Sequence, residues 1–466
     1  MSNKPSVLFA SSEVYPFVKT GGLADVSYGL PRALIDNCDV HVVLPLYRSI
    51  DREKFAIVSL NQGYIINMGG TEYFTDIYGC YYEGIEYRFI YTKILCERDS
   101  LYGDNESAYV DNAERFGIFS YAIVEMLLAG NYNIVHLNDW QTALVALLLK
   151  EKEILNIKSI FTIHNLAYQG IFDKSSLENL GIEESCFTMQ KIEFYNQVSF
   201  MKAGIAYGDK ITTVSNNYAK EILTKEFGCG LDGFLNYHKE KLVGIVNGID
   251  EQHYKRERSK KKAKKTYLKS VGFKGVKKPL FIFIGRFTWQ KGLDLLIESL
   301  DDIALLDCNI AIVGEGEEKY HKALKEISDR HRNINLYFGY DESLSLHMYE
   351  ATDFLLMPSI FEPCGLNQLI AMNCGAIPIV HDTGGLHDTV CDYKDINNLK
   401  KRGIGIVFRE QNSMNLYKSI KEAIMIYNNK IDYKKIAKLN RDCDFSWSRS
   451  AKRYIELYKT FIDTKH

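Results

Sequence analysis

The sequence of 466 residues lacks any long hydrophobic run. Apolar stretches such as residues 143–149 are far shorter than the roughly 20 residues that a membrane-spanning helix requires. An excess of charge of either sign is also missing, because 57 basic residues balance 59 acidic ones. No apolar signal segment precedes the first strand-like run. The sequence therefore predicts a cytoplasmic protein with neither a membrane nor a nucleic acid as its partner.

The ten cysteines also lack the spacing of a metal site or a disulfide framework. No two of them form a Cys-x-x-Cys pair. Scattered single cysteines are typical of reduced thiols in a cytosolic enzyme. We therefore expect neither a bound metal nor structural disulfides.

Short apolar, β-branched runs alternate with helical patterns along most of the chain. Strands are expected at residues 6–10, 40–44, 134–137, 159–163, 210–214 and 242–246, and again at 280–284, 309–313, 335–338, 354–357, 377–380 and 405–408. Helices are expected at residues 113–128, 141–151, 218–227, 292–300 and 317–329. This alternation predicts an α/β protein with two doubly wound domains. Hairpin strands near residues 64–93 interrupt the first series.

The boundary between the two domains is expected near residues 247–265. A strand ends at Asn247, and the basic tract 255–262 follows. No aromatic residue lies between the charges of this tract, and Ala263, Tyr267 and Leu268 continue it at helical spacing. We interpret the tract as a solvated helix face, with an acidic partner as the alternative.

Ligands of open α/β sheets bind beyond the carboxyl ends of the strands. The first strand is followed by Lys-Thr-Gly-Gly at residues 19–22, where glycines allow close approach of a ligand and the lysine offers a cation for a phosphate. Thr-Gly-Gly at residues 383–385 follows a strand of the second half and is predicted to form a second glycine-rich anion loop. A plain tight turn is the alternative interpretation of both segments.

Charged residues follow two further strands of the second half. Arg286 and Lys291 lie where a strand ends and a helix opens, so they could hold a diphosphate without a metal; solvated surface cations are the alternative. Glu362 is expected at a helix entrance, with Pro363 in the first turn. There Glu362 could hydrogen-bond a hydroxyl-rich ligand or serve as a capping carboxylate.

Two polar residues close strands of the first half, namely Asp139 and His164. Because several polar groups converge on the same sheet edge, both are candidate site residues, with a structural role as the alternative. The Gly-x-Gly-x-x-Gly match at residues 228–233 follows a helical stretch rather than a strand. It therefore does not indicate a dinucleotide site.

Taken together, these segments resemble the bacterial glycogen synthase and plant starch synthase family over nearly the whole chain. The similar segments are residues 19–25, 102–104, 111–116, 138–140, 164–170, 213–215, 228–233, 247–250, 285–292, 362–366 and 383–386. Each is weak alone, but their order and spacing are specific.

The resemblance implies a GT-B fold, in which two Rossmann-like domains face each other across a cleft. It implies an acceptor-side domain at residues 1–247, a nucleotide-sugar-binding domain at 248–445, and a C-terminal helix at 446–466 that crosses back to the first domain. The implied reaction is retaining transfer of glucose from ADP-glucose to the non-reducing-end 4-OH of an α-1,4-glucan such as glycogen, with release of ADP. ADP-glucose would be a co-substrate, and no cofactor or metal is implied.

The resemblance also implies roles for single residues. Arg286 and Lys291 would neutralise the departing diphosphate, and Glu362 would orient the donor glucose. His164 would hydrogen-bond the glucose, and Asp139 would support the acceptor or the charge at the anomeric carbon. Further donor-binding residues would be Lys19, Gly21, Gly22, Asp25, Gly365, Leu366, Thr383, Gly384 and Gly385.

Three positions depart from the family pattern. Gln141, Ile360 and Asn367 stand where the family often has histidine, a basic residue and threonine.

Other functions stay open: a related transferase using UDP-glucose or a small acceptor, an inactive glucan- or nucleotide-binding protein, and an NAD-dependent oxidoreductase. The presence of the expected polar groups disfavours an inactive binding protein. The lack of a strand-linked Gly-x-Gly-x-x-Gly disfavours an NAD-dependent oxidoreductase.

Overall fold

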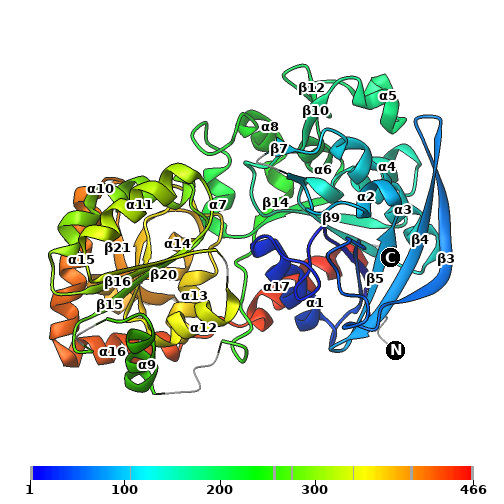
Figure 1. Cartoon of the computed structure of the whole chain (residues 1–466). Helices are drawn as coiled ribbons and strands as arrows, with labels where there is room; N and C mark the ends of the chain where they lie inside the picture. The colour runs from blue at the N-terminus through cyan, green and yellow to red at the C-terminus, as the bar shows by residue number, and fades with distance from the viewer. Residues whose placement is uncertain are drawn as a thin grey trace. The chain divides into compact units, whose positions relative to one another are not determined.

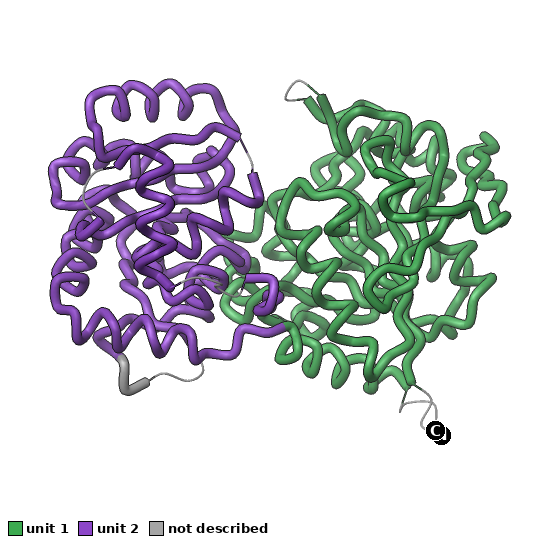
Figure 2. The backbone as a smooth tube through the Cα atoms, turned by 60° about the horizontal axis from the view of Figure 1, so that its bottom comes forward, with its two compact units in different colours: residues 1–247, 447–466 green, residues 248–446 purple. Residues whose placement is uncertain are grey.

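The computed structural model describes residues 4–104, 107–254, 259–273, 276–339, 341–398 and 402–462. The chain divides into two compact units (Figure 2). Unit 1 comprises Met1–Asn247 and Trp447–His466, and unit 2 comprises Gly248–Ser446. Each unit is built around one large β-sheet (Figure 1). Within the described part of the chain, no helix is long and apolar enough to cross a membrane.

The large sheet of unit 1 has the strand order β14-β13-β9-β8-β1-β2-β5-β4-β3. Its strands are β1 (Ser6–Ala10), β2 (Asp39–Pro45), β3 (Val58–Met68), β4 (Thr71–Tyr82), β5 (Ile85–Tyr91), β8 (Ile134–Asn138), β9 (Lys158–Ile163), β13 (Lys210–Thr213) and β14 (Leu242–Gly244). Neighbours from β14 to β5 pair in parallel, whereas β5, β4 and β3 pair antiparallel. The predicted hairpin is confirmed, since Gly69 and Gly70 turn between β3 and β4 with positive φ.

Helices and short strands complete unit 1. The helices are α1 (Gly22–Leu34), α2 (Lys93–Cys96), α3 (Asn112–Ala129), α4 (Leu144–Glu151), α5 (Ser176–Leu180), α6 (Phe200–Tyr207), α7 (Asn216–Glu221), α8 (Asp232–Tyr237) and α17 (Trp447–Ile462). Small sheets are formed by β10 (Ile171–Asp173), β11 (Glu193–Phe194) and β12 (Gln197–Ser199), and by β6 (Gly103–Asp104) and β7 (Ser107–Ala108).

The predicted helix at residues 218–227 was wrong in its length. Helix α7 begins at Asn216, after the Ser215 side chain accepts the Tyr218 N–H, and it ends at Glu221. The N–H groups of Leu223 and Thr224 bond three residues back, to Lys220 O at 3.2 Å and Glu221 O at 2.8 Å, so the chain tightens into turns.

The C-terminal helix α17 packs within unit 1 against α1 (Figure 1). A Cβ atom at Gly29 of α1 would lie 1.9 Å from Trp447 Nε1, so the indole requires glycine there. The Tyr458 hydroxyl lies 2.7 Å from His136 Nδ1 on the central strand β8. Burial lowers the pKa of His136 to about 3, so this contact joins two neutral groups.

Unit 2 has a sheet in the order β17-β16-β15-β18-β19-β21-β20, with all pairs parallel. Its strands are β15 (Leu280–Ile284), β16 (Asn309–Gly314), β17 (Ile334–Phe338), β18 (Phe354–Met357), β19 (Ile377–His381), β20 (Val390–Asp392) and β21 (Gly403–Phe408). Its helices are α9 (Lys260–Ser270), α10 (Leu293–Ala304), α11 (Glu318–Arg330), α12 (Glu342–Ala351), α13 (Asn367–Asn373), α14 (Gly384–Thr389), α15 (Ser413–Asn428) and α16 (Lys430–Arg441).

Alternate residues of the unit 2 strands fill two separate cores, one on each face of the sheet. On β15, Phe281 and Phe283 join one core, while Leu280 and Ile282 join the other. Strands buried on both faces are continuous apolar runs, which is the pattern that the sequence predicted.

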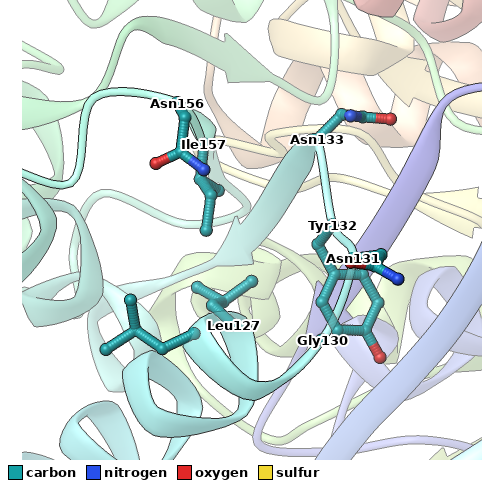
Figure 3. Close-up of a pocket in the computed structure, with 8 residues that line it drawn as sticks. Leu127, Gly130, Asn131, Tyr132, Asn133, Asn156 and Ile157 are labelled. Carbon is teal, nitrogen blue, oxygen red and sulfur yellow. The ribbon is translucent and has the colours of Figure 1, made fainter.

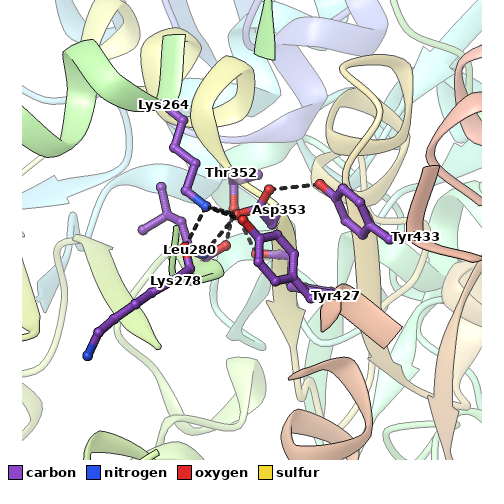
Figure 4. Close-up of polar contacts among 8 residues, drawn as sticks. Lys264, Lys278, Leu280, Thr352, Asp353, Tyr427 and Tyr433 are labelled. Atoms are coloured by element: carbon purple, nitrogen blue, oxygen red, sulfur yellow. Dashed lines mark hydrogen bonds and ion pairs between the residues drawn. The ribbon is translucent and has the colours of Figure 1, made fainter. Parts of the chain in front are cut away.

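The basic tract leads into helix α9. Residues 255–258 of the tract lie outside the described residues, and Lys261 and Lys262 are exposed as predicted. Lys264, two residues later, is buried: its Nζ donates to Asp353 Oδ2 at 2.5 Å and to the Tyr427 hydroxyl at 3.0 Å (Figure 4). The helix is therefore solvated on one face and anchored by a buried cation on the other.

Candidate functional site

Glu362 lies at the carboxyl edge of the unit 2 sheet, in the segment that follows β18. Lys291 Nζ donates to Glu362 Oε2 at 2.6 Å, and Ser359 Oγ donates to the same oxygen at 3.0 Å. The Glu362 side chain is 7 % exposed and that of Lys291 is 20 % exposed. A largely desolvated ion pair of this kind interacts strongly, because little water screens it.

Neighbouring backbone segments hold Glu362 in place. The Gly385 N–H donates to the Glu362 carbonyl at 2.9 Å, and the Ile360 N–H donates to the Gln290 carbonyl at 2.9 Å. Gly292 has φ of +70°, and a Cβ there would lie 2.0 Å from the Pro358 carbonyl. The segments after β15, β18 and β19 are thus joined, which sets the positions of Lys291 and Glu362.

The expected helix entrance at Glu362 was wrong. Helix α13 begins at Asn367, and Pro363 lies ahead of it rather than in its first turn. Gly365 has φ of +71°, a conformation that an α-helix does not contain. Glu362 is therefore not a capping carboxylate. Asn367, where the family often has threonine, donates its Nδ2 to the Ile284 carbonyl at 2.7 Å and so ties the helix start to β15.

The other predicted residues of unit 2 lie at the same sheet edge. Arg286 follows β15 and is exposed. Thr383 is buried at the start of α14, and its N–H donates to the His381 carbonyl at 2.9 Å. Gly384 has φ of +45°, and the N–H of Gly385 already bonds to Glu362. The predicted anion loop therefore uses the N–H groups of Thr383 and Gly385 to shape the chain.

In unit 1 the segment after β1 brings Lys19 and Asp25 together, with Lys19 Nζ 2.7 Å from Asp25 Oδ1. Helix α1 begins at Gly22. The Gly21 N–H donates to the carboxylate of Glu13 at 3.2 Å. Lys19 is one quarter exposed, so its ammonium can exchange Asp25 for another anion.

Asp139 and His164 are adjacent, as the sequence predicted from their place after β8 and β9. The His164 N–H donates to Asp139 Oδ1 at 2.8 Å, and Asp139 has φ of +57°. Burial raises the pKa of Asp139 to about 7, although backbone N–H bonds from His164 and Asn165 limit the rise.

The His164 imidazole has a defined tautomer. Burial lowers the pKa of His164 to about 3, so the ring is neutral. Its Nε2 lies 2.9 Å from Asn138 Oδ1, and Asn138 Nδ2 donates to the Ala10 carbonyl at 2.9 Å. Because that bond identifies Oδ1 as the Asn138 acceptor, His164 carries its proton on Nε2 and presents Nδ1 as an acceptor.

Sequence reasoning missed three residues that hold these groups. Glu13 accepts bonds from the glycine loop, Asn138 sets the His164 tautomer, and Ser359 donates to Glu362. All three lie at or just after the carboxyl ends of strands, which was the available signal.

A pocket of about 260 Å³ lies elsewhere in unit 1 (Figure 3). Its lining residues are Leu127, Leu128, Gly130, Asn131, Tyr132, Asn133, Asn156 and Ile157, just before the amino ends of β8 and β9. It is thus at the opposite edge of the sheet from Asp139 and His164. Among the residues that the structure describes, no three His, Cys, Asp or Glu side chains gather as a metal site.

Comparisons with known proteins bear on both units. The family described as "Starch synthase catalytic domain" matches residues 6–237, and "Glycosyl transferases group 1" matches residues 264–443. A glycogen synthase of Aquifex aeolicus is 41% identical over 97% of this chain and 98% of its own length. A glycogen synthase of Fusobacterium nucleatum is 38% identical over 98% of this chain and 99% of its own length. The chain belongs to the glycogen and starch synthase family.

Solved structures agree with this assignment. The catalytic domain of starch synthase IV from Arabidopsis thaliana, bound to ADP and acarbose, has a TM-score of 0.92 at 30% identity and covers 99% of this chain and 100% of its own. Sucrose-phosphate synthase from Thermosynechococcus elongatus shares the fold at a TM-score of 0.65 and 16% identity, with coverage of 99% and 100%. The predicted family, the GT-B fold with two Rossmann-like domains and the glycosyltransferase class are confirmed.

Proposed function

We propose that this chain transfers glucose from ADP-glucose to the non-reducing-end 4-OH of an α-1,4-glucan such as glycogen, with retention of configuration and release of ADP. The observation that carries the proposal is the likeness, over the full length, to a starch synthase domain bound to ADP and acarbose. Ten free cysteines, without a disulfide among them, suit a cytoplasmic location for the enzyme.

Unit 2 supplies the groups proposed to act on the donor. Arg286 and Lys291 neutralise the diphosphate as it departs, and the carboxylate of Glu362 orients the glucose hydroxyls. The 2.6 Å bond between Lys291 and Glu362 supports this division, because each group fixes the other before the donor binds. The backbone proposed to surround the donor consists of Gly365, Leu366, Thr383, Gly384 and Gly385. Of these, Gly385 acts through the bond from its N–H to the Glu362 carbonyl.

Unit 1 supplies the groups proposed for the sugar and the acceptor. His164 Nδ1 accepts a hydrogen bond from a glucose hydroxyl, since Nε2–H donates to Asn138 Oδ1. The Asp139 carboxylate stabilises positive charge at the anomeric carbon. For the donor, Lys19 exchanges its partner Asp25 for a phosphate oxygen. Gly21 and Gly22, which carry no side chains, leave room for the donor beside the lysine.

Retention can come from a covalent intermediate or from attack on the face that the leaving group vacates, and we propose the second route. The bond between the anomeric carbon and the diphosphate oxygen breaks, and the acceptor O4 forms the new bond on the same face. The departing phosphate oxygen takes the proton of the acceptor hydroxyl. No covalent intermediate with the chain is required, and the charged side chains act by stabilising the separated charges.

The donor base is tested by competition between ADP-glucose and UDP-glucose with glycogen as acceptor. We expect kcat/KM to favour ADP-glucose by at least tenfold. A preference for UDP-glucose would leave the fold and chemistry in place and overturn the proposed donor.

Lys19→Ala is expected to raise the KM for ADP-glucose about tenfold or more, with a smaller change in kcat, because the ammonium contacts the donor in ground and transition states alike. Steady-state kinetics with both substrates varied would show the KM for glycogen unchanged. An unchanged donor KM would remove Lys19 from the site.

The pKa of about 7 at Asp139 predicts a pH dependence of the rate. Because the ionised carboxylate is the proposed active form, kcat/KM falls as pH drops below 7, and Asp139→Asn has a low rate without this acid limb. The same residue affects stability. Its folded-state pKa exceeds the ordinary value near 4, so the native protein retains a proton that the unfolded chain loses, and stability falls as pH rises from about 4 to 7.

Thermal unfolding of wild type and Asp139→Asn between about pH 4 and 7 checks the predicted fall in stability independently of activity. A kcat/KM profile of wild type that is flat between pH 5.5 and 8 would contradict the role of Asp139.

A further inference from the structure

The carboxylate of Glu13 is the buried centre of the loop that carries Lys19. Glu13 is 4 % exposed and follows β1 by three residues. Its Oε2 accepts the N–H of Thr20 at 2.5 Å and that of Gly21 at 3.2 Å. Its Oε1 accepts the hydroxyl of Thr20 at 2.6 Å and that of Tyr102 at 2.7 Å. Four donors therefore converge on one carboxylate.

Further contacts fix the position of Glu13 itself. Ser11 Oγ donates to the Glu13 carbonyl at 2.8 Å, and Ser27 Oγ on α1 donates to Ser11 Oγ at 2.8 Å. The hydroxyls of Ser12 and Tyr102 lie 2.8 Å apart. The Glu13 backbone is thus held through Ser11 and α1, and its carboxylate is held by Tyr102. The carboxylate in turn fixes Thr20 and Gly21.

We propose that Glu13 is a positioning residue for donor binding: its carboxylate holds residues 19–22 in the conformation from which Lys19 reaches the donor. The Thr20 and Gly21 N–H groups are taken up by Glu13, so the loop offers the donor its lysine ammonium rather than these two amides. This inference rests on the proposed function, because Lys19 matters only if a phosphorylated donor binds there.

The chemistry of the four donors predicts how substitutions rank. Alanine removes every acceptor and leaves two backbone N–H groups without partners. Glutamine retains one oxygen for the Thr20 and Gly21 N–H groups, while the two hydroxyls can turn to accept from its amide. Glu13→Ala should therefore be severe, and Glu13→Gln should restore most of the function.

Steady-state kinetics with ADP-glucose and glycogen test the proposal. We expect Glu13→Ala to raise the donor KM at least tenfold with the glycogen KM unchanged, and Glu13→Gln to stay within about threefold of wild type. In a Lys19→Ala background, Glu13→Ala should add less than threefold, because its effect passes through Lys19. Glu13→Asp, which keeps the charge but is one methylene shorter, replaces the alanine variant if that does not fold.

The matched control is Asp209→Asn. Asp209 is another carboxylate of unit 1 that accepts a backbone N–H, from Ser159 at 2.8 Å, and it pairs with Lys150, but it lies at the amino edge of the sheet. The Asp209→Asn variant should have a lower thermal stability than wild type but no selective change in the donor KM. A full additive effect of Glu13→Ala on Lys19→Ala, or an equal rise in both KM values, would overturn the positioning role.

Hydrogen exchange at the Thr20 and Gly21 amides separates this inference from the proposed function. Exchange there should rise at least tenfold in Glu13→Ala and little in Glu13→Gln, whichever reaction the enzyme catalyses. Unchanged exchange would refute the loop contact itself. If exchange rises in Glu13→Ala but the wild-type enzyme releases no ADP, the proposed function is refuted and the loop contact still stands.

Discussion

Glu362→Ala is expected to lower kcat by about 10²–10³-fold, a loss of roughly 3–4 kcal/mol in transition-state stabilisation. The reason lies in the desolvated pair at the carboxyl edge of unit 2, where Lys291 Nζ lies 2.6 Å from Glu362 Oε2. Without the carboxylate, the glucose hydroxyls lose an acceptor and Lys291 loses the group that holds it in place. Initial rates at saturating ADP-glucose and glycogen measure the effect.

Lys291→Ala should cost a similar factor, and the double variant should cost less than the product of the two single losses, because the residues touch. Asp307→Ala is the control. Asp307 also pairs with a lysine of unit 2, with its Oδ1 2.8 Å from Lys278 Nζ, but ahead of β16 at the amino edge of the sheet. Near-normal turnover of Glu362→Ala, or an equal loss in Asp307→Ala, would exclude the assigned site.

Asp353→Asn is expected to have the largest effect on stability, about 3–5 kcal/mol, because it leaves the ammonium of Lys264 buried without its counter-ion. The side chains of Lys264 and Asp353 are 6 % and 3 % exposed. Asp353 also accepts the Leu280 N–H at 2.9 Å and the Tyr433 hydroxyl at 2.7 Å (Figure 4). The same residue thus joins α9, β15 and α16.

Calorimetry should show this loss as a fall of roughly 6–20 °C in the melting temperature of unit 2. Lys264→Met should be similarly severe, and the double variant should cost less than the sum of the two. Lys322→Ala breaks an exposed ion pair with Glu318 on α11 and should leave the melting temperature unchanged. A shift below about 2 °C for Asp353→Asn would contradict the importance of the buried pair.

Strands were predictable because parallel strands buried on both faces are unbroken apolar runs. The predicted strand at residues 280–284 coincides with β15, and that at 354–357 coincides with β18. Helix ends were less predictable. Residues 222–227 carry a helical pattern, yet the chain tightens into turns there, because the end of a helix depends on local hydrogen bonds that periodicity does not report.

The charged groups of the site were predictable for a different reason. Glu362, Lys291, Asp139 and His164 all follow strands, and parallel strands end at one edge of a sheet. Buried contacts elsewhere in the two units were not predictable, since the approach of Glu13 to Thr20, or of Lys264 to Asp353 across 89 positions, depends on packing. A buried carboxylate and an exposed one look alike in sequence.

The decisive experiment measures release of nucleoside diphosphate from ADP-glucose by wild type and Glu362→Ala. Each enzyme is assayed with and without glycogen and with and without EDTA. We expect glycogen-dependent ADP release by wild type that EDTA does not abolish, and a loss of at least 10²-fold in Glu362→Ala. Failure of wild type to release nucleotide from either ADP-glucose or UDP-glucose, while glycogen still binds, would contradict the account and indicate a glucan-binding protein without transferase activity.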